Sequence, residues 1–159
     1  MNDITKEYEI ACLTNDRIKR CELLNKHASK INFDDIPIIQ FIDACEAGNL
    51  QNVKNILNAN PNINISACDD AAIREACYNG HLEIAIFLHP HSNVFNKYGN
   101  VFQIVCLNGH TNIAKWLYSI NPNIINSPDF EFGYKYAIHN QHHKLVDWLK
   151  SIDAKNILK

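Results

Sequence analysis

The sequence predicts an all-α solenoid of about five helix–turn–helix–loop repeats, with degenerate repeats at both ends. The first indication is a near-duplication: residues 76–88 read ACYNGHLEIAIFL, and residues 105–117 read VCLNGHTNIAKWL. The second is that similar segments recur along the chain, in steps of 33, 32, 29 and 32 residues. Self-similarity at this period is typical of arrays in which each unit is too small to bury its own apolar face.

Each unit carries the same pattern around a reference residue in its first helix. The references are Cys12, Cys45, Cys77, Cys106 and Ile138. A large apolar residue stands four positions earlier: Tyr8, Phe41, Ile73, Phe102 and Tyr134. The residue just before the reference is small: Ala11, Ala44, Ala76, Val105 and Ala137. An apolar residue of the second helix follows eleven positions after the reference: Leu23, Ile56, Leu88, Leu117 and Leu149.

The spacing within a unit predicts two short helices. Phe41, Ala44 and Cys45 have the i, i+3, i+4 spacing that puts side chains on one helical face. NPNINIS at 60–66 and NPNIINS at 121–127 are expected to end the second helix, because Pro and Asn favour turns. The 29-residue step predicts a shortened loop around residues 89–100. A glycine stands three residues past the reference, where a left-handed turn residue is wanted: Gly48, Gly80 and Gly109.

The terminal units are degenerate and are predicted to be caps with polar outer faces. In the first unit an Asn-Asp dipeptide at 15–16 replaces Gly-His. Its second-helix stripe fits better after a one-residue slip, onto Ile18, Cys21 and Leu24. The last unit has Gln141 in place of the glycine. Whether the first unit is a true repeat stays open.

Composition argues against several function classes. The chain is 20% charged with a net charge of −2, without the clustered Lys and Arg of a nucleic-acid binder. The RIKR stretch at 17–20 is interpreted as a solvated helix face. No apolar run approaches the roughly 20 residues that span a bilayer, and the N-terminus lacks the layout of a secretory signal. We expect an intracellular, cytoplasmic protein that is not secreted and binds neither nucleic acid nor membrane.

The six cysteines include no CxxC pair, which argues against a zinc site. Four of them recur about one repeat apart, so we expect buried, reduced and inert thiols in an intracellular protein. Cys21 and Cys68 fall outside this series, and Cys68 is predicted to be the one exposed thiol.

Paired carboxylates at 34–35 and 69–70 raise the possibility of acid–base catalysis. Each pair lies just upstream of a first helix, where carboxylates cap free N–H groups, and we expect capping. The sequence contains no Ser, His and Asp in the order of a catalytic triad, no glycine-rich phosphate-binding loop and no HExxH motif. We therefore expect no enzyme activity, metal or cofactor.

The repeated segments resemble ankyrin repeats. ACYNGHLEIAIFL, ACEAGNLQNVKNIL and VCLNGHTNIAKWL are similar to the family's AAxxGHLEVVKLLL, and NPNINIS corresponds to its GADVN exit into a loop finger. The resemblance covers residues 34–152 well, although AAIR at 71–74 stands where the family has TPLH. It implies one ankyrin-repeat domain over residues 1–159, with repeats at 4–33, 34–66, 67–94, 95–126 and 127–159.

A narrower resemblance concerns origin. The Cys-for-Ala substitution, the KWLYSINPNI wording and the Asn, Ile and Lys bias resemble divergent ankyrin proteins of giant DNA viruses of amoebae. AT-rich cellular genomes produce a similar bias, so a viral and a cellular origin both stay open. The partner implied is a host or viral protein, and for a viral chain the location implied is the host cytoplasm.

The resemblance also bears on the histidines. His139, His142 and His143 spell H-x-x-H-H, which superficially suggests a metal site. His142, however, holds the turn position of His81 and His110, where the family's side chain bonds backbone across the turn. The resemblance therefore implies a structural role for His142.

By resemblance, the chain is a non-catalytic module that binds a partner protein through a concave groove and loop fingers. A monomer is expected, and Tyr78, Tyr98 and Leu107 are expected to form an apolar strip, with Tyr as a favoured interface anchor. The alternative is a structural or self-assembling component that associates through its end repeats. The candidate contacts near the turns are Glu46, Ala47, Tyr78, Asn79, Leu107, Asn108, His139 and Asn140. Those in the fingers are Asp35, Cys68, Asp70, Lys97, Tyr98 and Glu131.

Overall fold

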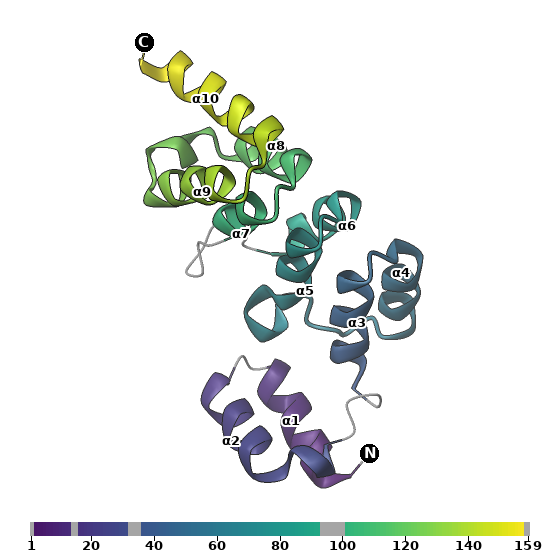
Figure 1. Ribbon diagram of the computed structural model, residues 1–159. Coiled ribbons are helices and arrows are strands. Elements are labelled where there is room, and N and C mark those ends of the chain that lie inside the picture. The colour runs from purple at the N-terminus through teal and green to yellow at the C-terminus, as the bar shows by residue number, and fades with distance from the viewer. Residues whose placement is uncertain (1, 14–15, 32–35, 93–100, 158–159) are drawn as a thin grey trace. The chain divides into compact units, whose positions relative to one another are not determined.

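A computed structural model describes residues 2–13, 16–31, 36–92 and 101–157 (Figure 1). Within these ranges the chain forms ten α-helices, and none of the described residues lies in a β-strand. The predicted all-α fold is therefore confirmed. Among the helices in these ranges, none combines the length and the apolar character needed to cross a membrane.

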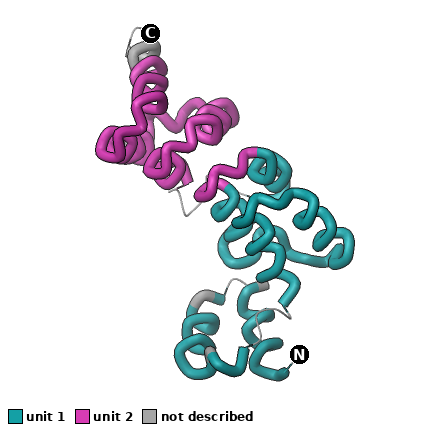
Figure 2. The backbone as a smooth tube through the Cα atoms, turned by 45° about the vertical axis from the view of Figure 1, so that its right-hand side comes forward, with its two compact units in different colours: residues 1–76, 83–94 teal, residues 77–82, 95–159 magenta. Residues whose placement is uncertain are grey.

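The chain divides into two compact units, drawn in different colours in Figure 2. The first holds residues 1–76 and 83–94, and the second holds residues 77–82 and 95–159. The elements up to residue 91 are α1 (Asp3–Leu13), α2 (Arg17–His27), η1 (Ala28–Lys30), α3 (Pro37–Glu46), α4 (Leu50–Ala59), α5 (Ala67–Tyr78), α6 (Leu82–Leu88) and η3 (His89–His91). Those that follow are α7 (Val101–Leu107), α8 (Thr111–Ile120), η4 (Pro122–Asn126), α9 (Pro128–His139) and α10 (His143–Ile157).

Consecutive helices pack as hairpins within each unit. In the first unit α1 packs on α2 and α3 packs on α4, and in the second α7 packs on α8 and α9 packs on α10. α7 also packs on α9, so the first helices of two successive repeats lie side by side in the second unit. This is the stacking that the repeat pattern predicted.

The helix ends follow the turn residues of the sequence. α4 ends at Ala59 and α8 ends at Ile120, each directly before an Asn-Pro-Asn segment, as predicted. Asn49 caps α4, because its side-chain oxygen accepts a hydrogen bond of 2.9 Å from the backbone N–H of Asn52. Of the loop around 89–100, which was expected to be shortened, residues 93–100 lie outside the described residues.

The residues that end the first helices have left-handed backbones. Gly48, Gly80 and Gly109 have φ values of 75°, 86° and 74°. Gln141 takes the same role with a φ of 59°, although a side chain makes this region unfavourable. The predicted glycine position is therefore confirmed, and the last described turn keeps the conformation without the glycine.

The recurring positions of the repeat form the core. All four reference cysteines are completely buried, as are Phe41 and Leu117. Ile56 is half-buried, and Val53, three residues earlier, is the fully buried side chain of α4. Burial raises the pKa of three core thiols to about 12, so they stay protonated near neutral pH: Cys45, Cys77 and Cys106.

The slipped register predicted for the first unit is wrong. Ile18 is 83% exposed and Cys21 is exposed, whereas Leu23 is only 3% exposed. Leu23 stands eleven residues after Cys12, as in the other repeats, so α2 packs on α1 in the regular register. Because Cys21 is exposed and Cys68 is half-buried, the prediction of Cys68 as the one exposed thiol is also wrong.

The last repeat departs from the pattern at its reference position. Ile138 is 49% exposed, while Phe130 and Ala137 are buried. α9 meets α7 through another face, on which the rings of Phe130 and Phe102 stack at 6.0 Å. The face that carries Ile138 is left exposed within the described part of the chain.

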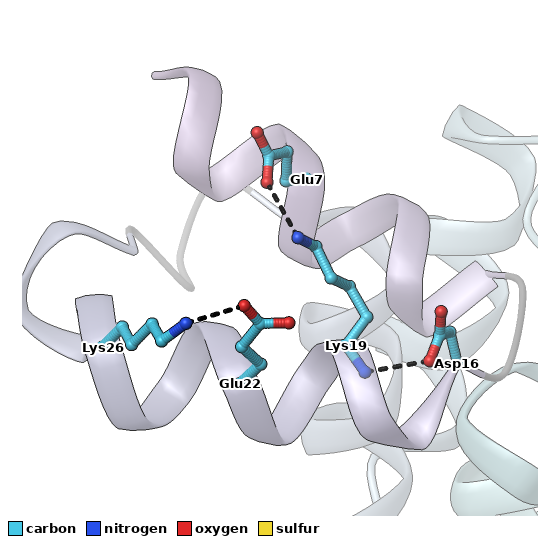
Figure 3. Close-up of polar contacts among 5 residues, drawn as sticks. All are labelled: Glu7, Asp16, Lys19, Glu22 and Lys26. Atoms are coloured by element: carbon cyan, nitrogen blue, oxygen red, sulfur yellow. Dashed lines mark hydrogen bonds and ion pairs between the residues drawn. The ribbon is translucent and has the colours of Figure 1, made fainter.

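Figure 3 shows one ion pair between α1 and α2 and a second ion pair within α2. Lys19 Nζ lies 3.6 Å from Glu7, and the Asp16 side chain accepts a 2.9 Å hydrogen bond from the Lys19 backbone N–H. Lys26 pairs with Glu22 at 2.9 Å and lowers the pKa of that exposed carboxyl. Arg20, by contrast, is only 13% exposed and faces the protein, so a purely solvated face is wrong for this residue.

Candidate functional site

The turns that end α5, α7 and α9 share one layout within the second unit. Each turn begins with the last helical residue, followed by an Asn and then by the left-handed residue. The last helical residues are Tyr78, Leu107 and His139, and we call these three the turn row.

Side chains from the following repeat hold the backbone at two members of the turn row, Tyr78 and Leu107. The Tyr78 carbonyl oxygen lies 2.8 Å from His110 Nε2 and accepts a 3.0 Å hydrogen bond from the Asn108 side-chain amide. The Leu107 carbonyl oxygen lies 2.8 Å from Nε2 of His142 and accepts 2.9 Å from the amide of Asn140. Because a carbonyl only accepts hydrogen bonds, both imidazoles must carry their proton on Nε2.

These contacts correct the role expected for the histidines. The predicted bond from His142 to backbone exists, but it reaches the preceding repeat and does not close its own turn. His110 does the same one repeat earlier. The amides of Asn108 and Asn140, predicted as partner contacts, are engaged in this linkage as well. The described part of the chain holds no cluster of three His, Cys, Asp or Glu residues arranged to bind a metal ion.

The glycines of these turns are needed for a second reason besides their backbone angle. A Cβ atom added to Gly109 would lie 2.6 Å from Nδ1 of His142. One added to Gly80 would lie 2.8 Å from Nδ1 of His110. The imidazoles of His110 and His142 therefore pack directly on the turn glycine of the preceding repeat.

The side chains of the turn row face solvent, although the backbone is held in place at Tyr78 and Leu107. Tyr78 is 48% exposed, Leu107 is 37% exposed, and His139 is exposed. Tyr98, the third member of the expected apolar strip, lies outside the described residues.

Two aromatic residues missed by the sequence analysis extend this surface along α9. Phe132 is 47% exposed and Tyr136 is 40% exposed, and they stand seven and three residues before His139. This spacing places all three on one helical face. Lys135 lies over the Phe132 ring at 5.7 Å and pairs with Glu131, a predicted finger contact that is exposed. The sequence could have indicated this surface, because Phe132 and Tyr136 form an aromatic pair at i, i+4 outside the positions that the repeat pattern predicts to be buried.

The remaining candidates in the first unit are not gathered into one cluster by any described contact. Glu46 and Ala47 are exposed at the end of α3. Burial raises the pKa of Glu75, and the nearby Glu46 carboxylate raises it further. Among the other predicted contacts, Asn79 is half-buried at the turn after α5, and three lie outside the described residues: Asp35, Lys97 and Tyr98.

The start of α5 has an unusual backbone. Cys68, Asp69 and Asp70 have φ values of 56°, 61° and 59°, a left-handed conformation that side chains make costly. Both Cys68 and Asp70 are half-buried. Asp69 ion-pairs with Arg20 at 3.5 Å, and Oδ1 of Asp70 is buried without a hydrogen bond. The sequence analysis, which expected a simple helix cap, missed the ion pair.

Comparison with known proteins identifies the repeat. The family model of ankyrin repeats, in three copies, matches residues 41–129. No curated protein matches the chain significantly. Ankyrin repeats generally mediate protein–protein interaction. The matched segment is more than half of the sequence and contains the left-handed turns at Gly48, Gly80 and Gly109, so this chain belongs to the ankyrin-repeat family.

Proposed function

We propose that the chain is a non-catalytic module that binds a partner protein through the turn row and the aromatic face of α9. The observation that carries this proposal is the turn row itself. The carbonyls of Tyr78 and Leu107 each meet two side chains of the next repeat, while the Tyr78 and Leu107 side chains stay exposed.

A fixed backbone with free side chains favours binding. Ordering a loop at an interface costs free energy, and a backbone that is already fixed lowers that cost. Tyr and Phe are enriched where protein interfaces gain most of their affinity, because they bring a large contact area with few rotatable bonds. Tyr78, Phe132 and Tyr136 supply such side chains in the second unit.

The chemistry of the surface favours a protein partner. The net charge of −2 gives no excess of cations for phosphate backbones. The finer elements of the proposal are a concave groove with loop fingers, a monomeric state, an intracellular location, and a host or viral protein as partner. The free thiols support the intracellular location, and the KWLYSINPNI resemblance supports a viral setting.

The test is affinity capture with the full chain from cells of its natural setting, followed by mass spectrometry. Wild-type protein is compared with a Tyr78→Ala/Leu107→Ala variant and with Lys115→Ala, which changes an exposed residue of α8. We expect one defined partner with wild type and Lys115→Ala, and its loss with the double variant. Equal capture by all three proteins would contradict the assignment of the surface.

A separate observation favours a second function, self-assembly. Ile18 on α2 is 83% exposed and Ile138 on α9 is 49% exposed, and these apolar side chains favour self-assembly through the end repeats. This alternative predicts oligomers by light scattering that dissociate in an Ile18→Lys/Ile138→Lys variant. A monomer at all concentrations would exclude it.

A further inference from the structure

We propose that Cys12 and Cys68 form a reversible disulfide site, in which Cys68 is the attacking thiol and Cys12 is the buried resolving thiol. The proposal is independent of the partner-binding function. It assigns a reaction to two cysteines that the repeat architecture alone does not connect.

The two thiols are neighbours in the first unit. Cys12 lies near the end of α1 and is completely buried, and Cys68 lies at the start of α5 and is half-buried. The side chains of Cys12 and Cys68 interact with each other. Both residues belong to the first unit. A disulfide between them requires the two sulfurs to approach to about 2.0 Å.

A separate contact holds the flanking residues together. Arg20 Nη1 donates a 3.3 Å hydrogen bond to the carbonyl of Ala11, the residue before Cys12. Arg20 Nη2 lies 3.5 Å from the carboxylate of Asp69, the residue after Cys68. The Arg20 and Asp69 side chains are only 13% and 16% exposed. One largely buried guanidinium thus bridges the two backbone segments that carry the thiols.

The charges around the pair assign the two roles. The hydrogen bond from Cys12 lowers the pKa of Cys68, burial opposes this effect, and the guanidinium groups of Arg20 and Arg74 lower the pKa further. The pKa of Cys12 is raised by the same hydrogen bond and by burial. Cys68 is also the more exposed of the two thiols, because Cys12 is completely buried, so Cys68 is the one that an external disulfide can reach. Attack on a disulfide proceeds through the thiolate, which a lowered pKa favours. Tyr8, which also contacts Cys12, stays neutral because burial raises its pKa to about 12.

The reaction is thiol–disulfide exchange with a small disulfide such as oxidised glutathione. The Cys68 thiolate attacks one glutathione sulfur, the glutathione S–S bond breaks, and one glutathione thiolate leaves and takes up a proton. Cys12 then loses its proton and attacks Cys68 Sγ, which breaks the mixed disulfide and releases the second glutathione. Two protein thiols are oxidised, and one glutathione disulfide is reduced to two thiols.

The backbone around Cys68 is not regular α-helix. Cys68 opens the left-handed segment at 68–70, so it does not sit inside a relaxed helical turn. The disulfide would tie α1 to α5 and would enclose the segment between residues 12 and 68 in a covalent loop. Oxidation would also change the surface around Cys68 and Asp70, two of the predicted finger contacts.

In the test, the full chain is equilibrated with glutathione buffers that range from reducing to oxidising ratios. The remaining thiols are then blocked under denaturing conditions, and the peptides are mapped by mass spectrometry without reduction. We expect one intramolecular Cys12–Cys68 cross-link, with the loss of two hydrogens, that is reversed by reducing buffer. Cys21→Ser, which removes the exposed thiol, is the matched control and should titrate at the same glutathione ratio as wild type.

Two variants test the roles of the thiols. In Cys12→Ser the reaction should stop at a glutathione adduct on Cys68, and Cys68→Ser should remove the cross-link. Should the buried Cys12 variant fail to fold, wild type and Cys68→Ser decide the question. Adducts on Cys21 without any Cys12–Cys68 peptide at the most oxidising ratio would overturn the proposal, as would a cross-link between two chains.

Discussion

His142 Nε2 lies 2.8 Å from the carbonyl oxygen of Leu107, across the boundary between two repeats. The same contact joins His110 to Tyr78 one repeat earlier. The turn glycine and the histidine of the next repeat therefore connect neighbouring repeats, because the glycine leaves room for the imidazole. Nearest-neighbour contacts of this kind supply the stability of repeat proteins.

The inter-repeat histidine bond should contribute measurably to stability. We expect His142→Ala to lower the free energy of unfolding by about 1–3 kcal/mol, because the Leu107 carbonyl loses one of its two donors. His143→Ala, which removes an exposed imidazole one residue later, is the matched control. Urea denaturation of both variants measures the difference. Equal stability of the two variants would show that the bond adds nothing.

The close approach of glycine and imidazole predicts an energetic coupling. Gly109→Ala should cost about 1–2 kcal/mol for the left-handed backbone alone, and more because the new methyl group meets the His142 ring. When His142→Ala removes the ring, the cost of Gly109→Ala should fall. A double-mutant cycle by urea denaturation measures this coupling. Strictly additive costs would contradict a steric contact between the two positions.

The last described turn offers a stabilising substitution. Gln141 holds a φ of 59°, which glycine adopts without steric cost. We expect Gln141→Gly to raise the free energy of unfolding by about 1 kcal/mol. Gln51→Gly, on the exposed face of α4, should lower it by about 1 kcal/mol. Thermal or urea unfolding compares the two, and a loss of stability in both would argue against the left-handed turn.

The buried thiols predict a loss of stability at alkaline pH. Burial raises the pKa of Cys77 and Cys106 from 9.0 to about 12, so above pH 9 the unfolded chain loses these protons before the folded chain does. Their stabilising contribution is complete below pH 9 and is lost as the pH rises toward 12, by at most about 1.4 kcal/mol per pH unit for each thiol. The free energy of unfolding, measured from pH 8 to 11, should fall less steeply with pH in Cys106→Ala than in wild type. Cys21→Ser, at an exposed thiol, should leave the slope unchanged, and equal slopes in all three proteins would contradict the burial effect.

Local patterns made most of the repeat predictable. The i, i+3, i+4 spacing identified buried positions such as Phe41 and Cys45, and the glycine spacing identified the left-handed turns. These features depend on residues close in sequence. The exposure of Ile138 was not predictable in this way, because it depends on whether a further helix covers α9.

The interaction surface was predictable only in part. Tyr78 and Leu107 were identified from their place before the turn, and the structure leaves both exposed. The reach of His142 to the preceding repeat and the contact of Cys12 with Cys68 were missed, because they join residues 35 and 56 positions apart. No local period of the sequence encodes such contacts.

The most direct test of the proposed binding surface is the dissociation constant for the captured partner, measured by titration calorimetry with the full chain. We expect Tyr78→Ala to weaken binding by about tenfold or more, the loss typical of an interface anchor, and Lys115→Ala to leave it unchanged. Unchanged affinity in a Tyr78→Ala/Leu107→Ala/His139→Ala variant that remains folded would contradict binding through the turn row.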